Sequence, residues 1–204
     1  MDFFSSESLD SLNKIYRINL INSITGYKSA NLLGTVSKKG VENLAVFSSV
    51  THLGSNPALL SFFVRPNVVP RNTYKNIKEK RFFTVNHISK EKIDDAHHTS
   101  AKYDENISEF DKTSFQSEYK NNWKAPFVKD SAVQLGCKYL NEYYLKENGC
   151  SMIIASIELI FIRKGLLQND GWVELTKGNV VTVNGLDAYA LPKTIKRFKY
   201  ARPK

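Results

Sequence analysis

Most of this chain alternates apolar and polar residues with a period of two, the pattern of β-strands that have one buried face. Residues 43–50 and 59–64 are rich in β-branched, aromatic and leucine side chains. Between them, the Gly, Ser, Asn and Pro of residues 54–57 predict a chain reversal. Further strands are predicted at residues 31–37, 82–87, 151–162 and 180–183, and from Val133 onward. This succession predicts a mainly β fold with a few helices, as a closed or nearly closed antiparallel barrel.

The helical signals are few and short. A helix is predicted to start with Asn72 or Thr73 as its N-cap, and residues 89–98 predict a second one. Residues 1–13 are expected to be a loosely docked lead-in. Residues 104–123 are polar with scattered aromatics, and long excursions of this kind frequently form functional lids.

A basic residue, Arg71, stands directly before the first of these helices. Free backbone N–H groups, the positive end of the helix dipole and a guanidinium together form a site for a phosphate monoester. From residue types alone, an ordinary helix cap beside a solvated arginine remains an open alternative. Ser48 and Ser49 leave a similar choice, because their hydroxyls can bond a ligand or satisfy the edge of their own strand.

The composition is that of one folded domain with excess positive charge. The 204 residues are 42% hydrophobic and carry a formal net charge of +9, which favours an anionic partner: a nucleotide, nucleic acid or an acidic surface. The basic cluster within residues 193–204 is typical of a solvated tail. Cys137 and Cys150 are too few for a disulfide framework and are expected to be buried, reduced thiols.

Targeting and membrane signals are missing from the sequence. No apolar run approaches the roughly 20 residues needed to cross a membrane. Residues 1–14 lack the basic and apolar regions of a secretory signal. We therefore expect a cytoplasmic protein that makes no membrane contact.

The sequence also lacks familiar catalytic motifs. Its four histidines form no His-Glu-x-x-His arrangement and there is no cysteine cluster, so no metal site is predicted. It contains no Gly-x-Ser-x-Gly elbow, Walker loop or Gly-x-Gly-x-x-Gly fingerprint. Aromatic pairs flanked by Lys or Arg, the usual stacking platform for nucleic acid, are also missing, which makes nucleic acid an unfavoured partner. We predict no catalytic acid, base or nucleophile.

Ordered blocks of sequence carry a family resemblance: LINSITGYKSANLLGTVSKKGVENLAVFSSV at residues 20–50, then HLGSNPALLSFFVRP, RNTYKNI and FTVNH, and finally HTSAKYDENISEFDKT at residues 98–113. Together they resemble the flavin reductase-like family of FMN-binding split β-barrels. The resemblance runs from about Leu20 to the C-terminus. It implies an antiparallel split β-barrel that binds FMN, takes hydride from NAD(P)H and forms a homodimer with the flavin near the subunit interface.

The resemblance also implies roles for particular residues. The segment 48–50 would line the isoalloxazine ring, the segment 71–73 would hold the phosphate, and the segment 100–103 would border the same pocket. The full set of implied cofactor-binding residues is Ser48, Ser49, Val50, Arg65, Arg71, Asn72, Thr73, Asn86, His87, Ser100 and Lys102. A non-catalytic FMN-binding or electron-transfer flavoprotein remains an alternative, since the same pocket binds flavin whether or not a nicotinamide can stack on it.

Overall fold

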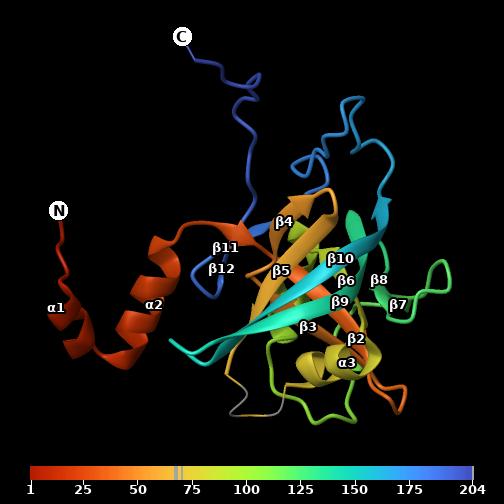
Figure 1. Ribbon diagram of the computed structural model, residues 1–204, viewed down its shortest axis with the longest axis horizontal. Helices are drawn as coiled ribbons and strands as arrows, with labels where there is room; N and C mark the ends of the chain where they lie inside the picture. The colour runs from red at the N-terminus through yellow and green to blue at the C-terminus, as the bar shows by residue number, and fades with distance from the viewer. Residues whose placement is uncertain (67–68, 70, 204) are drawn as a thin grey trace.

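One large antiparallel sheet organises the protein. The structure, a computed structural model, describes residues 1–66, 69 and 71–203. Seven strands pair in the order β3-β2-β6-β9-β10-β5-β4 (Figure 1). Their bounds are β2 (Asn31–Val36), β3 (Glu42–Phe47), β4 (Thr51–Ser55), β5 (Ala58–Val64), β6 (Phe82–His87), β9 (Val133–Leu145) and β10 (Cys150–Ile162). The predicted mainly β, antiparallel fold is therefore confirmed.

Two smaller sheets flank the large one. The first contains β1 (Lys28–Ser29), β11 (Thr182–Asn184) and β12 (Ala188–Ala190), and the second pairs β7 (Ser117–Glu118) with β8 (Phe127–Val128). The strand predicted at residues 180–183 corresponds to β11, preceded by an isolated bridge between Ser89 and Val180. The reversal predicted at residues 54–57 joins β4 to β5.

Two apolar clusters fill the interior on the two sides of β2. One contains Leu33, Phe62, Phe83 and Ile153, all fully buried. The other gathers around Leu32 and Leu44 and extends to β11. Neighbouring strand residues point to opposite faces, so Leu32 and Leu33 enter different clusters. The sheet therefore carries a core on each side, which explains the nearly continuous burial along β2.

The helix α3 (Asn72–Lys80) packs against β2 and β3. The prediction of Asn72 or Thr73 as its N-cap is wrong. Arg71 occupies the cap position, and its side chain makes no capping hydrogen bond. Thr73 is instead turned into the interior, where its hydroxyl oxygen accepts a hydrogen bond from Asn43 Nδ2 at 3.0 Å. The second predicted helix divides into a short 3-10 turn, η1 (Lys90–Lys92), and α4 (Ile93–His98).

The N-terminal segment is helical, which corrects the prediction of a loose lead-in over residues 1–13. The helices are α1 (Ser6–Ser11) and α2 (Lys14–Ile24), and Figure 1 shows both standing to one side of the sheet. Each start is capped: Ser5 Oγ accepts from Ser8 N at 3.2 Å, and Asn13 Oδ1 accepts from Ile15 N at 2.9 Å. No helix among the described residues is long and apolar enough to cross a membrane.

The excursion at residues 104–123 is docked on the protein. It contains η2 (Glu109–Lys112) and β7, and both Phe110 and Phe115 are buried. Cys137 is buried as predicted, whereas Cys150 is only half-buried because it begins β10 beside the hairpin turn. The basic C-terminal tail is exposed through Pro203, in agreement with a solvated tail, and Lys204 lies outside the described residues.

Candidate functional site

Four of the predicted site residues gather where β3 begins beside the first turn of α3. Asn43, at the start of β3, holds Thr73 by the hydrogen bond described above, and both side chains are buried. Asn72 Nδ2 reaches the Tyr103 carbonyl at 3.4 Å, which brings the segment containing Ser100 and Lys102 next to the same turn. We call this region, formed by Asn43 and residues 71–73, the α3 end of the site.

Arg71 carries an unmet hydrogen-bonding demand at this end. Its Nε is buried and has no hydrogen-bond partner in the described part of the chain. A buried guanidinium N–H without an acceptor is costly, and a charged donor more so than a neutral one. Because no side chain caps α3, its first-turn N–H groups are free of a competing acceptor from Arg71. An anion bound here would satisfy both Arg71 and the helix start.

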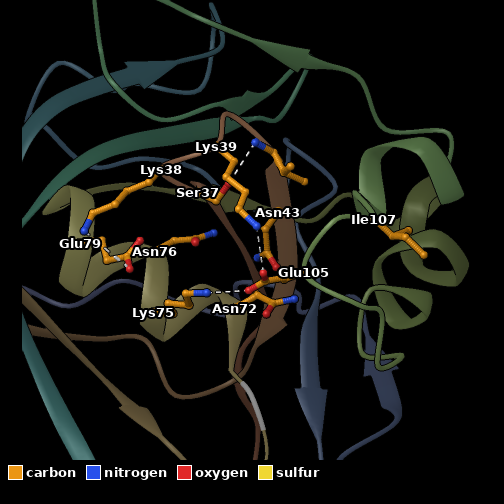
Figure 2. A pocket seen from close by; sticks show the side chains of 11 residues that line it. Ser37, Lys38, Lys39, Asn43, Asn72, Lys75, Asn76, Glu79, Glu105 and Ile107 are labelled. Carbon is orange, nitrogen blue, oxygen red and sulfur yellow. Dashed lines mark hydrogen bonds and ion pairs between the residues drawn. The ribbon is translucent and has the colours of Figure 1, made fainter.

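A cavity of about 170 Å³ adjoins the α3 end, and Figure 2 shows the side chains that line it. Lys75 and Lys39 both bind Glu105, with Nζ to carboxylate oxygen distances of 2.5 and 3.4 Å. These lysines lower the pKa of Glu105, so its carboxylate stays ionised at neutral pH. The lysines are therefore largely compensated, which leaves Arg71 as the better candidate for an added anion.

The other predicted residues near β3 lie at its opposite end, where the chain passes from β3 to β4. Ser29 Oγ donates to the Val50 carbonyl at 2.7 Å and receives a bond from Asn31 Nδ2 at 3.0 Å. This relay fixes the backbone of Val50 to β1 and β2. We call residues 48–50 the β3–β4 end of the site.

Ser48 and Ser49 follow the last residue of β3 and are half-buried. Ser49 Oγ accepts from Phe63 N at 3.1 Å, so its hydroxyl satisfies the edge of β5. This is the alternative role that residue type left open. Nothing comparable binds the Ser48 hydroxyl among the described residues, so it stays a candidate ligand contact.

His87 lies level with this end, because Asn31 pairs with both Phe47 and His87 across the sheet. Its Nδ1 is buried and has no hydrogen-bond partner within the described residues. Burial lowers the pKa of His87 to about 4, so the imidazole is neutral at pH 7. It lines a second cavity of about 270 Å³ that is bounded by residues 87–92 and 114–131.

Two other predicted ligands are placed differently. Asn86 is fully buried, donates to the Leu32 carbonyl and to Thr84 Oγ1, and accepts from Val128 N. This corrects its assignment as a ligand contact: its amide joins strands and has no face toward solvent. Arg65 is exposed at the end of β5, and no hydrogen bond or ion pair links its side chain to another described residue.

The residues that sequence reasoning missed are Asn31 and Asn43, which fix the two ends of the site. Their only signal is a polar amide at an inward position of an otherwise apolar strand. Buried amides require partners, which is why each one anchors a neighbouring segment. Among the described residues, no group of His, Cys, Asp and Glu is placed to hold a metal ion.

Comparison with known proteins identifies this arrangement. The profile of a family described as flavin reductase like domain matches residues 25–176, which include both ends of the site. The chain belongs to the flavin reductase-like family.

Solved structures agree with this membership. A protein from Shewanella frigidimarina, described as a flavin reductase with a split barrel domain, superposes with a TM-score of 0.95 at 37% identity, covering 98% of this chain and 100% of that one. Nitrilotriacetate monooxygenase component B from Bacillus cereus gives 0.83 at 19% identity over 98% of both chains. An FMN-binding protein from Thermus thermophilus gives 0.70 at 14% identity over 86% and 93% of the two chains. The last two likenesses show the fold alone.

A curated relative from Aquifex aeolicus, whose function is uncharacterised, is 30% identical over 108 residues. The match spans 52% of this chain and 55% of the relative. It therefore covers only about half of the relative's length.

Proposed function

We propose that this protein binds FMN and transfers hydride from NAD(P)H to the flavin. The observation that carries the proposal is the buried, unpartnered Nε of Arg71 at an uncapped helix start. A phosphate monoester would supply the missing acceptor there. Membership of the flavin reductase-like family supports a flavin as the molecule that bears this phosphate.

The two ends of the site are spaced for an elongated mononucleotide. Asn43 and Phe47 are four residues apart on β3, which corresponds to about 13 Å along a strand. We assign the phosphate to the α3 end, where Arg71 would bind it, and the isoalloxazine ring to the β3–β4 end. There the Ser48 hydroxyl and the fixed Val50 backbone would contact the polar edge of the ring.

A flavin supplies the hydride chemistry when it is bound, and the protein supplies position and electrostatics. The Ser29 and Asn31 relay holds Val50 in place, and the Asn43 contact holds the first turn of α3. Neutral His87 adds no positive charge at pH 7 to the β3–β4 end. The chain's own residues thus act by binding and orienting, in agreement with the prediction of no catalytic acid, base or nucleophile.

The proposal is tested by comparing FMN and riboflavin binding in wild type and Arg71→Ala. A charge-assisted hydrogen bond contributes about 1.5–3 kcal/mol, so the FMN dissociation constant should rise roughly 10- to 150-fold. Riboflavin has no phosphate, and its binding should hardly change. Arg65→Ala is the matched control, because Arg65 is exposed and removes the same charge nearby. Equal losses for both flavins in Arg71→Ala would make Arg71 structural and place the phosphate elsewhere.

Steady-state oxidation of NADH and NADPH by the FMN-loaded protein tests the enzymatic part. Turnover with either nucleotide supports a flavin reductase type of oxidoreductase. FMN binding without turnover would instead support the electron-transfer alternative. The homodimer and the cytoplasmic location also stay predictions.

A further inference from the structure

The helix α2 presents an apolar surface that its own chain does not cover. None of its eleven residues, all of them described, is buried. Ile15 is 68% exposed, Ile24 66% and Tyr16 53%. An isolated helix of this length is marginal in water, and helices in proteins owe most of their stability to packing. Something other than the described chain must therefore hold α2 in place.

The solved S. frigidimarina structure gives independent support for a fixed position. The superposition covers 98% of this chain at a TM-score of 0.95, so only about four of the 204 residues fall outside it. Most of α2 is therefore included. Two chains that share 37% of their residues place the same unburied helix in the same position. This agreement is expected if both helices pack on a partner.

The same chain offers a matching surface on its large sheet. Met152 on β10 pairs with Tyr143 on β9 and with Phe63 on β5, so the three side chains form one row across three strands. Phe63 is 39% and Tyr143 53% exposed, and Met152 is half-buried. The neighbouring residues Phe62 and Ile153 enter the core from the opposite face. We call the row of Phe63, Tyr143 and Met152 the outer row.

We propose that α2 of one copy packs on the outer row of a second copy, and that the second copy returns the contact. Each chain supplies both an apolar helix and an apolar sheet face, which is what a two-fold symmetric interface requires. Burying the exposed fractions of Tyr16, Tyr27, Tyr143 and Phe63 would remove about 400 Å² from water. Typical interfaces bury about 800 Å² per partner, so these aromatics supply about half, and the exposed isoleucines of α2 add to it.

This interface would adjoin the β3–β4 end of the site. Ser49 Oγ accepts from the backbone N–H of Phe63, a member of the outer row. A docked α2 would therefore lie next to the proposed isoalloxazine position, so loss of the dimer should weaken flavin binding. This consequence rests on the proposed function, whereas the assembly itself does not.

The assembly is tested with single charge substitutions on the exposed surfaces. Ile15→Glu places a carboxylate in the first turn of α2, where the helix dipole favours it, so the helix itself should persist. Tyr143→Glu does the same to the outer row. The matched controls are Asn19→Glu, one turn further along α2, and Lys146→Glu on the β9–β10 hairpin, both at exposed positions. Sedimentation equilibrium without added flavin measures the assembly, and circular dichroism checks the fold.

Wild type and both controls should be dimers at micromolar concentration. Ile15→Glu and Tyr143→Glu should raise the dimer dissociation constant roughly 100-fold or more, since each buries two unpaired charges per dimer. A monomeric wild type, or wild-type assembly of either variant, would overturn the proposal. So would unfolding of Ile15→Glu alone, because that would place Ile15 in the chain's own core. A dimer that dissociates as expected but binds no flavin would support the assembly and contradict the proposed function.

Discussion

Glu109 provides a direct test of how the edge of β3 is held. This residue begins η2 and is only 4% exposed, and its Oε2 accepts from Leu44 N at 2.8 Å. Leu44 lies on β3, whose other edge pairs with β2. Glu109 therefore satisfies a strand N–H that no neighbouring strand reaches. The substitutions Glu109→Gln and Glu109→Leu separate the hydrogen bond from the volume, because both side chains are of similar size and only glutamine can accept from Leu44.

The expected magnitude follows from the buried donor. Leaving the Leu44 N–H unsatisfied should cost about 1–3 kcal/mol of unfolding free energy in Glu109→Leu relative to Glu109→Gln. Burial raises the pKa of Glu109, and the Leu44 hydrogen bond opposes this only in part. A carboxyl whose pKa is raised by folding adds stability below its unfolded pKa of about 4.3 and loses it as pH rises through the folded pKa. At pH 7, Glu109→Gln should therefore equal or exceed wild type.

Urea denaturation at pH 7 and pH 4.5 measures both effects. Wild type should gain on Glu109→Gln as the pH falls, because the carboxyl takes up its proton more readily in the folded state. The glutamine variant should be more stable than the leucine variant at both pH values. If glutamine and leucine destabilise equally at pH 7, the Leu44 contact contributes nothing. If the difference between wild type and glutamine is the same at both pH values, the assigned direction of the pKa shift is wrong.

Two further predictions concern the core of the sheet. His87 is neutral in the fold because burial lowers its pKa to about 4, so wild type should lose up to about 3 kcal/mol relative to His87→Gln as pH falls from 6.5 to 4; parallel pH profiles of unfolding would contradict this. In Gly34→Ala, the added Cβ would lie 2.2 Å from the Pro126 carbonyl oxygen and 2.6 Å from Thr84 Oγ1. This overpacking should cost about 3 kcal/mol or more by denaturation, and a near-neutral result would mean that the Pro126 backbone yields easily.

Most of the large sheet could be predicted because its strands alternate clearly. The missed strand is β4, whose sequence THLGS is polar and largely exposed. It exists because Thr51 and Ser55 pair with Ser61 and Ala58 of β5, and a burial pattern contains no signal for such an edge. Exposed edge strands are thus defined by their partner more than by their own residues.

The helix α2 was missed for a related reason. Amphipathic periodicity marks a helix with one face against its own core, and α2 buries no residue in this chain. Its apolar residues Ile15, Tyr16, Ile18, Ile21 and Ile24 are spread around the helix. The local signal that could have found it is the cap, since Asn13 precedes the first turn and accepts from its backbone.

The site was predictable as a region but only in part residue by residue. Arg71 and Ser48 remain candidates for ligand contact, whereas the polar atoms of Asn86 and Ser49 are used inside the protein. The sequence alone cannot distinguish these cases, because a polar side chain in a strand looks the same whether its partner is a ligand or a neighbouring strand. The deciding quantity is the count of internal partners for each buried polar atom. By that count, Arg71 has a buried donor left over among the described residues and Asn86 has none. A substitution at Asn86 should therefore reduce stability first, and one at Arg71 should reduce anion binding first.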